Sequence, residues 1–197
     1  MEVDYDKLYA LAERYQKNNP GDKWELLYDH MRDVGFENVY RIRRPQFFEA
    51  FSKYLARFGM FRRGGLNRDK TILLLSTYRK PFLEYLLDPS DRTLASAWMK
   101  CFAALDDMGC AATPTQITKI LMGLGGRFPA IDSRVHVVMI NHPLFLSRGF
   151  DSLVAGLKEG RTQLKTEGRG ELIPWERILD MALWEAGPNL DDWLVIS

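Results

Sequence analysis

The sequence predicts an all-α fold, with one compact helical unit spanning residues 1–197. Apolar residues recur at three- and four-residue steps along most of the chain, which is the period of an amphipathic helix. Proline and glycine stand between the periodic segments, where helices are expected to begin and end. With 46% hydrophobic residues, the chain can bury one substantial core or at most two small ones. We therefore expect a helical protein with about nine or ten helices.

The first three helices are expected within residues 5–59. Apolar and aromatic residues recur over 5–15, and the helix should end near the Asn-Asn-Pro-Gly at 18–21. The pattern resumes over 24–34, where Gly35 should end the second helix. The third helix, over 47–58, is rich in aromatic residues. It should begin just after Pro45 and end at Gly59.

Residues 72–125 are expected to form four helical segments. The run over 72–87 has strand-like apolar density, but Pro81 interrupts a long helix, and we favour two helical pieces. Residues 93–105 are rich in the strong helix formers alanine, leucine and methionine. Thr113 is a natural N-cap, and Pro114 and Gln116 complete the start of the next helix, which should end at Gly125-Gly126.

The C-terminal part is expected to contain helical segments over 135–139, 144–157 and 173–186. The segment over 158–170, KEGRTQLKTEGRG, is polar and carries several glycines. We interpret it as a surface segment within the same domain.

Positive charge is concentrated between residues 41 and 80. This stretch carries eleven Lys or Arg against Glu49 and Asp69, a net charge of +9, which leaves −8 for the rest of the chain. Such a distribution suits a protein that holds a polyanion on one side. The alternative is that these side chains form the solvated faces of helices. The eleven residues are Arg41, Arg43, Arg44, Lys53, Arg57, Arg62, Arg63, Arg68, Lys70, Arg79 and Lys80.

Composition also bounds the cellular context. Cys101 and Cys110 are too few for a disulfide framework or a four-cysteine metal site, and we interpret both as buried thiols. No apolar run approaches the length that crosses a bilayer, and the N-terminus is unlike a secretory signal. We expect a cytoplasmic protein with no membrane partner, no metal and no other cofactor, and we favour a monomer.

Residues 125–139, GGRFPAIDSRVHVVM, place Asp132 between apolar residues and immediately before Ser133-Arg134. A helix, a short break containing glycine, a second helix and a loop that ends in an aspartate follow one another over about 93–140. This order resembles the helix-hairpin-helix DNA glycosylase superfamily, in which a Val-Asp-Thr-His-Val type sequence opens the last helix. The resemblance covers about a quarter of the chain.

The resemblance implies roles for individual residues. Asp132 would be the catalytic aspartate, and the hairpin would run from Leu105 to Thr113, with Gly109 approaching a DNA phosphate. Family members that use a lysine carry it at the start of the helix after the hairpin. Lys119, at least one turn further along, is the nearest candidate.

Asp132 can be interpreted either as a catalytic residue or as a structural one. A carboxylate at the start of a helix can stabilise an oxocarbenium-like transition state and deprotonate the attacking water. The same residue type is a preferred N-cap, so Asp132 could equally be a purely structural cap. One residue can fill both roles.

A protein that acts on a base within duplex DNA must flip the base out of the stack. We expect phosphate contacts from the basic region, and a wedge or a base pocket from aromatic residues. Aromatic residues at helical spacing are more often core residues, and a basic loop can be an ordinary surface loop. The candidate DNA-binding residues are Arg57, Arg62, Arg63, Arg68, Lys70, Gly109 and Arg134, and the candidates for wedge or pocket are Phe61, Trp98 and Trp184.

The leading hypothesis is a monofunctional DNA glycosylase that binds double-stranded DNA, excises a modified or damaged base and leaves an abasic site. A modified base of the kind found in bacteriophage DNA, removed in antiviral defence, is the target we expect. Two alternatives stay open. One is a non-catalytic DNA-binding helix-hairpin-helix module, and the other is a helical protein-interaction or toxin-antitoxin component.

Overall fold

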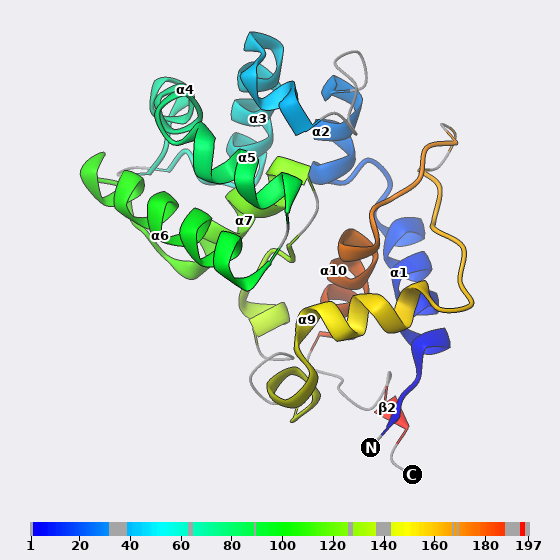
Figure 1. Ribbon diagram of the computed structural model, residues 1–197. Helices are drawn as coiled ribbons and strands as arrows, with labels where there is room; N and C mark the ends of the chain where they lie inside the picture. Colours follow the sequence, from blue (N-terminus) through cyan, green and yellow to red (C-terminus); the bar gives the residue numbers. More distant parts are fainter. Residues whose placement is uncertain are drawn as a thin grey trace. The chain divides into compact units, whose positions relative to one another are not determined.

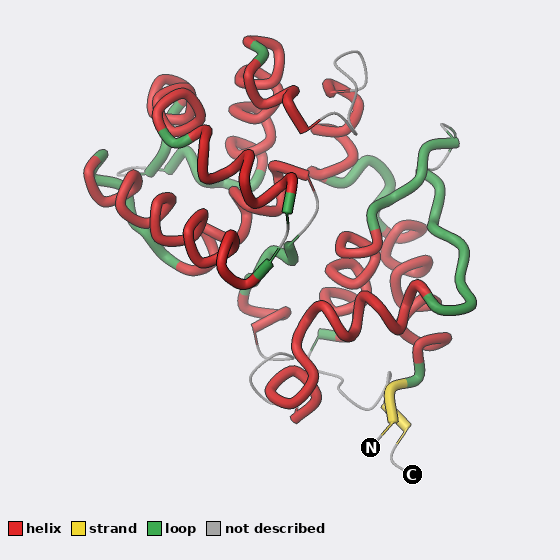
Figure 2. The backbone as a smooth tube through the Cα atoms, viewed as in Figure 1, coloured by secondary structure: helices red, strands yellow, loops and turns green. Residues whose placement is uncertain are grey.

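The described part of the chain is mostly helical (Figure 2). The computed structural model describes residues 2–31, 39–62, 65–88, 90–125, 128–136, 143–166, 168, 170–187 and 194–195. Strands β1 (Glu2–Val3) and β2 (Leu194–Val195) form one short antiparallel pair, in which Glu2 is opposite Val195. The predicted all-α fold class is confirmed.

Contacts between residues divide the chain into two compact units. Unit 1 consists of Met1–Pro20 together with Phe128–Ser197, and unit 2 is Gly21–Arg127. The predicted helix-hairpin-helix region, residues 93–140, is therefore shared between them. We describe each unit by itself, and a single folded unit over residues 1–197 stays a prediction.

Unit 1 is built on helix α1 (Tyr5–Asn18), helix α9 (Pro143–Lys158) and helix α10 (Trp175–Ala186), which lie side by side in Figure 1. The predicted N-terminal helix is confirmed as α1, and Asp4 is its N-cap, accepting a hydrogen bond from the Lys7 amide at 3.0 Å. The apolar faces of the three helices form one core. Its buried members include Leu8, Leu11, Ala12, Val135, Leu153, Leu157, Ile178, Leu179, Ala182 and Leu183.

The predicted surface segment over 158–170 is more structured than its polar composition suggested. Lys165 and Leu172 form an antiparallel bridge, and the Ile173 amide donates to the Leu164 carbonyl at 2.6 Å. Leu164 and Thr166 are buried, whereas Lys165 between them is exposed, so the side chains alternate at these three positions. The other described residues between 158 and 170 are exposed or half-buried, in agreement with the predicted surface segment.

Unit 2 packs its helices around the aromatic face of helix α3, which spans Pro45–Arg57. Phe47, Phe51 and Tyr54 are fully buried, with ring centroids 5.4 and 5.8 Å apart along the series. These rings supply the large apolar area that a core of this size requires. Unit 2 contains α2 (Lys23–Met31), the 3₁₀ helix η2 (Val39–Arg43), α3 (Pro45–Arg57), α4 (Arg68–Thr77), α5 (Arg79–Leu87), α6 (Asp91–Asp107) and α7 (Pro114–Gly125).

The two helical pieces predicted over 72–87 are confirmed as α4 and α5, which meet at Tyr78. The predicted start of α7 is also confirmed. Thr113 accepts from the Gln116 amide, and the Gln116 side chain accepts from the Thr113 amide, both at 3.3 Å. The predicted end of the second helix falls partly on residues 32–38, outside the described residues.

Helices α3 and α6 end in the same way. Gly59 and Gly109 adopt φ values of +71° and +62°, and the residue after each glycine donates back to the last turn. The Met60 amide donates to the Leu55 carbonyl at 3.1 Å, and the Cys110 amide donates to the Leu105 carbonyl at 2.8 Å. These are Schellman ends, which favour glycine because its backbone reaches positive φ without strain.

Among the described residues, none of the helices combines the length and the apolar character that crossing a bilayer requires.

Candidate functional site

Asp132 opens a short helical segment over 133–136. Its Oδ1 atom accepts hydrogen bonds from the amides of Arg134 and Val135, at 3.0 and 3.1 Å, and its carbonyl accepts from the His136 amide at 2.8 Å. The N-cap interpretation is thus confirmed. Asp132 is half-buried, and Oδ2 has no hydrogen bond within the described part of the chain. The two hydrogen bonds to Oδ1 therefore fix the orientation of the carboxylate.

Residues 128–131 form the connector that leads to Asp132, and the buried carboxylate of Asp180 holds it in place. The Ala130 amide donates to Oδ1 of Asp180 at 2.8 Å, and the Asp132 amide donates to the Ala130 carbonyl at 2.8 Å. The other carboxylate oxygen of Asp180 is paired with the Arg177 guanidinium, one turn earlier on α10. Both side chains are only 4% exposed. Sequence reasoning missed this pair, although two opposite charges three residues apart within IPWERILDMALWEA were a visible signal.

Arg134 and Trp184 contact each other in unit 1. The Arg134 guanidinium lies 4.2 Å from the centroid of the Trp184 ring, a cation–π geometry. Trp184 also contacts Tyr15 edge to face, with the two ring centroids 5.1 Å apart. The centroid of the Tyr15 ring lies 5.4 Å from the Arg177 guanidinium. The proposed roles of Arg134 in DNA binding and of Trp184 in a base pocket stay predictions, and both side chains have structural partners.

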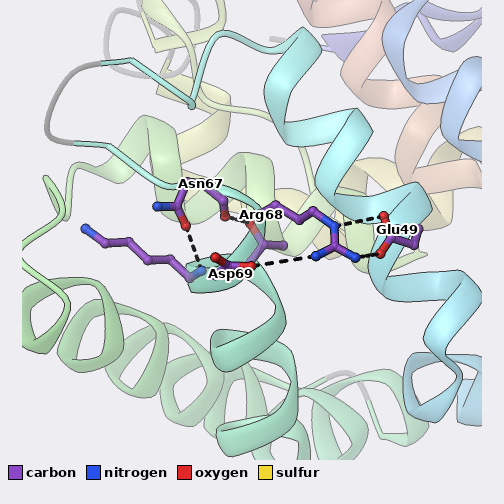
Figure 3. Close-up of polar contacts among 6 residues, drawn as sticks. Glu49, Asn67, Arg68 and Asp69 are labelled. Carbon is purple, nitrogen blue, oxygen red and sulfur yellow. Dashed lines mark hydrogen bonds and ion pairs between the residues drawn. The ribbon is translucent and has the colours of Figure 1, made fainter.

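The basic stretch of unit 2 is partly neutralised by partners. Figure 3 shows the Arg68 guanidinium against both carboxylate oxygens of Glu49, with Asp69 3.6 Å away. The hydrogen bond to Arg68 holds the pKa of the Glu49 carboxyl below its usual value, and the pKa of Arg68 is raised by the same bond. Asn67 caps α4 by accepting from the Lys70 amide at 2.8 Å. Arg68 is thus less able to attract DNA than an isolated arginine.

Two further basic residues serve the packing of unit 2. The Lys70 ammonium donates to the Met108 carbonyl at 2.8 Å and lies 3.4 Å from the Cys110 sulfur, so it stabilises the end of α6. Arg41 is 3% exposed and donates to the Leu124 carbonyl in the last turn of α7. The net charge counted over 41–80 therefore overstates the charge that unit 2 presents to a polyanion.

A cavity of about 280 Å³ beside the first turns of α7 is lined by both Arg62 and Lys119. The Lys119 ammonium lies 5.0 Å from the centroid of Phe58, and the Lys23 ammonium lies at the same distance from that ring. Among the described residues that line the cavity, none is acidic. The lining residues are Phe58, Gly59, Met60, Arg62, Gly65, Ala111, Thr113, Thr115, Gln116 and Lys119.

The local fold fixes the positions of Arg62 and Lys119. The Tyr54 hydroxyl donates to the Lys119 carbonyl at 3.0 Å, which ties α7 to α3. Gly59 allows Arg62 to approach, because a Cβ atom at position 59 would lie 3.2 Å from the Arg62 Nε. The cavity is therefore a concave, positively charged surface beside the N-terminal end of a helix, which itself favours anions.

The remaining predicted residues are less closely grouped. Arg57 is exposed in the last turn of α3, Phe61 is half-buried next to the cavity wall, and Trp98 is half-buried on α6. Gly109 is exposed, and its conformation is accounted for by the end of α6. Arg63 lies outside the described residues.

Comparison of the chain with protein-family models, with curated proteins and with solved structures gave no match. The resemblance to helix-hairpin-helix DNA glycosylases rests on the residues quoted above, and Asp132 and Lys119 belong to different units.

Proposed function

We propose that the protein is a DNA N-glycosylase, in which Asp132 activates the water that displaces a base. The observation that carries this proposal is that the two carboxylate oxygens of Asp132 differ in their hydrogen bonds. Oδ1 is held by two backbone amides, while Oδ2 has no hydrogen bond within the described residues. A carboxylate fixed in this way can accept a proton from water without losing its orientation.

The electrostatics of the site suit a base and a stabiliser of positive charge. Breaking the bond between base and sugar develops positive charge on the deoxyribose, and a fixed carboxylate lowers the energy of that state. Backbone amides at the start of a helix interact favourably with negative charge, and two of them donate to Oδ1 of Asp132. Asp132 therefore fits the role of a general base better than that of a general acid.

The cavity in unit 2 supplies the positive charge that DNA binding needs. Arg62 and Lys119 line it together with the hydroxyls of Thr113 and Thr115. Charged and hydroxyl donors at a helix start are typical of contacts to phosphate oxygens. We expect these residues to hold the DNA backbone, and a modified or damaged base to be the target.

Product analysis tests the proposal directly. The protein is incubated with unmodified duplex DNA and with heavily modified bacteriophage DNA, and the products are examined by mass spectrometry. We expect a free base together with abasic sites in at least one of the two samples. Intact DNA in both samples, at protein concentrations that saturate binding, would contradict the glycosylase proposal.

The role of Lys119 is tested separately. A lysine that attacks the sugar forms a Schiff base, which borohydride reduces to a stable covalent adduct. We propose a monofunctional enzyme, so we expect base release without a trapped protein–DNA adduct. An adduct that disappears in a Lys119→Met variant would instead assign a nucleophilic role to Lys119.

A non-catalytic DNA-binding module is the second candidate, favoured by the confirmed capping role of Asp132. It predicts salt-dependent DNA binding that survives loss of Asp132, with no released base. In both cases, removing a phosphate contact with Arg62→Gln or Lys119→Met should lower the slope of log K against log salt by about 1. Lys100→Met, at an exposed position of α6, is the matched control that should leave the slope unchanged.

A further inference from the structure

One face of α10 contacts both ends of the segment that carries Asp132. Arg177, Asp180 and Trp184 are spaced three and four residues apart, so they lie on the same side of the helix. Asp180 binds the Ala130 amide, before Asp132, and Trp184 lies under the Arg134 guanidinium, after it. The short segment is thus held from both sides by a single rigid element.

The contact at Ala130 is the stronger of the two. A hydrogen bond from an amide to an ionised carboxylate is about twice as strong as one between neutral groups. It is strengthened further where water is excluded, and Asp180 is 3% exposed. The Arg177 guanidinium forms an ion pair with this buried carboxylate and balances its charge.

Stability alone does not explain the buried ion pair between Arg177 and Asp180. Apolar residues of similar volume often give equal or greater stability than a buried pair of charges. One oxygen of Asp180 also accepts a hydrogen bond from the Ala130 amide in the connector. An apolar side chain could not accept this hydrogen bond. The contribution of Asp180 is therefore to the conformation of the connector.

We propose that Asp180, supported by Arg177, is a positioning residue that fixes the orientation of Asp132. The connection runs from the Asp180 carboxylate to the Ala130 amide, and from the Ala130 carbonyl to the Asp132 amide. Its significance for catalysis rests on the function proposed above for Asp132. The structural part of the proposal, that Asp180 fixes this connector, is independent of any activity.

Two double variants distinguish a role of Asp180 in positioning the connector from a role in stabilising the fold. Arg177→Met with Asp180→Asn removes both buried charges but keeps an oxygen that accepts from the Ala130 amide. Arg177→Met with Asp180→Leu removes the charges and that acceptor, with a side chain of similar volume. Both variants remove the two charges of the buried pair together, so neither partner of this pair is left alone and both variants are expected to fold.

Amide hydrogen exchange, measured by NMR on the full chain, gives the decisive comparison. The Ala130 amide should exchange about tenfold faster or more in the Leu variant than in the Asn variant, because it has lost its acceptor. The Leu11 amide, in the core of the same unit, should exchange at the same rate in both variants. Equal exchange rates at Ala130 in the two folded variants would overturn the proposal.

Base release extends the test to function. On a substrate that the wild type cleaves, kcat should fall in the Leu variant and recover in the Asn variant, with KM unchanged in both. Equal kcat values would overturn the positioning role in catalysis. If the wild type releases no base from any DNA, the glycosylase proposal fails, whereas the exchange comparison still decides whether Asp180 fixes the connector.

Discussion

Cys101 is fully buried in α6, and its burial raises the pKa of the thiol to about 12. Ionising it inside the folded protein would place a thiolate in an apolar environment. In the unfolded chain the same thiol ionises near its ordinary pKa of 9.0. The stabilisation that follows from the neutral buried thiol is complete below pH 9 and is lost as the pH rises toward 12.

We therefore expect the free energy of unfolding of the wild type to fall relative to that of Cys101→Ala above pH 9. The difference should change with a slope that rises through pH 9 toward about 1.4 kcal/mol per pH unit, because only the wild-type unfolded chain releases this proton. Urea denaturation at pH 8, 9 and 10 measures it, and ionisations common to both proteins cancel. Parallel pH profiles would show that Cys101 ionises equally in both states.

The sequence predicted the capping role of Asp132 correctly, because an N-cap depends on residues within one turn. It did not predict the contacts of Asp180, Lys70 or Arg41, whose partners lie 38 to 83 residues away. Counting charges along the chain cannot show which of them are buried. Residue roles that depend on distant partners therefore required the structure.

At the scale of helices, the sequence predicted most elements and several of their ends. Pro45, Pro114 and the glycines at the ends of α3 and α6 act locally, so they can be recognised without tertiary information. The antiparallel bridge between Lys165 and Leu172 was missed, because the polar composition around it concealed the burial of Leu164 and Thr166.

The Schellman end of α6 gives a direct test of this local reasoning. Replacing Gly109 with alanine should lower the free energy of unfolding by about 1–2 kcal/mol, because φ stays positive and an L-residue is strained there. No heavy atom lies within 4 Å of a Cβ at this position, so the loss would come from the backbone alone. Thermal or urea denaturation measures it.

Gly109→Asn is the matched control, because asparagine tolerates the left-handed conformation better than alanine and should lose less stability. Gly59→Ala should lose at least as much as Gly109→Ala, since the new Cβ also displaces Arg62. A Gly109→Ala variant as stable as the wild type would contradict the assigned helix end.

At the scale of the whole molecule, no pattern in the sequence indicates that the two ends of the chain belong to one unit. Helix α1 packs against α10, more than 150 residues later in the chain, and β1 pairs with β2. Hydrophobic periodicity identifies the face that each helix buries but not the helix it is buried against. The arrangement of unit 1 thus depends on tertiary packing.

Leu8 tests this arrangement. It is fully buried in the core that α1 shares with α10, and Leu8→Ala should lower the stability of unit 1 by about 2–5 kcal/mol. We expect amides of α10, such as that of Leu183, to exchange faster in this variant. Leu73→Ala, at an exposed position of α4, is the control. Unchanged exchange in α10 would show that α1 does not support it.

The central claim is that Asp132 activates water, beyond its confirmed role as an N-cap. Asp132→Asn tests it most directly, because asparagine keeps the capping geometry and removes the carboxylate. Asp4→Asn, at the N-cap of α1, makes the same chemical change at a cap with no proposed catalytic role. Base release and DNA affinity are measured on the same preparations of the wild type and both variants. We expect Asp132→Asn to bind DNA with unchanged affinity and to release no base, while Asp4→Asn releases base at the wild-type rate. Full base release by Asp132→Asn would contradict the account.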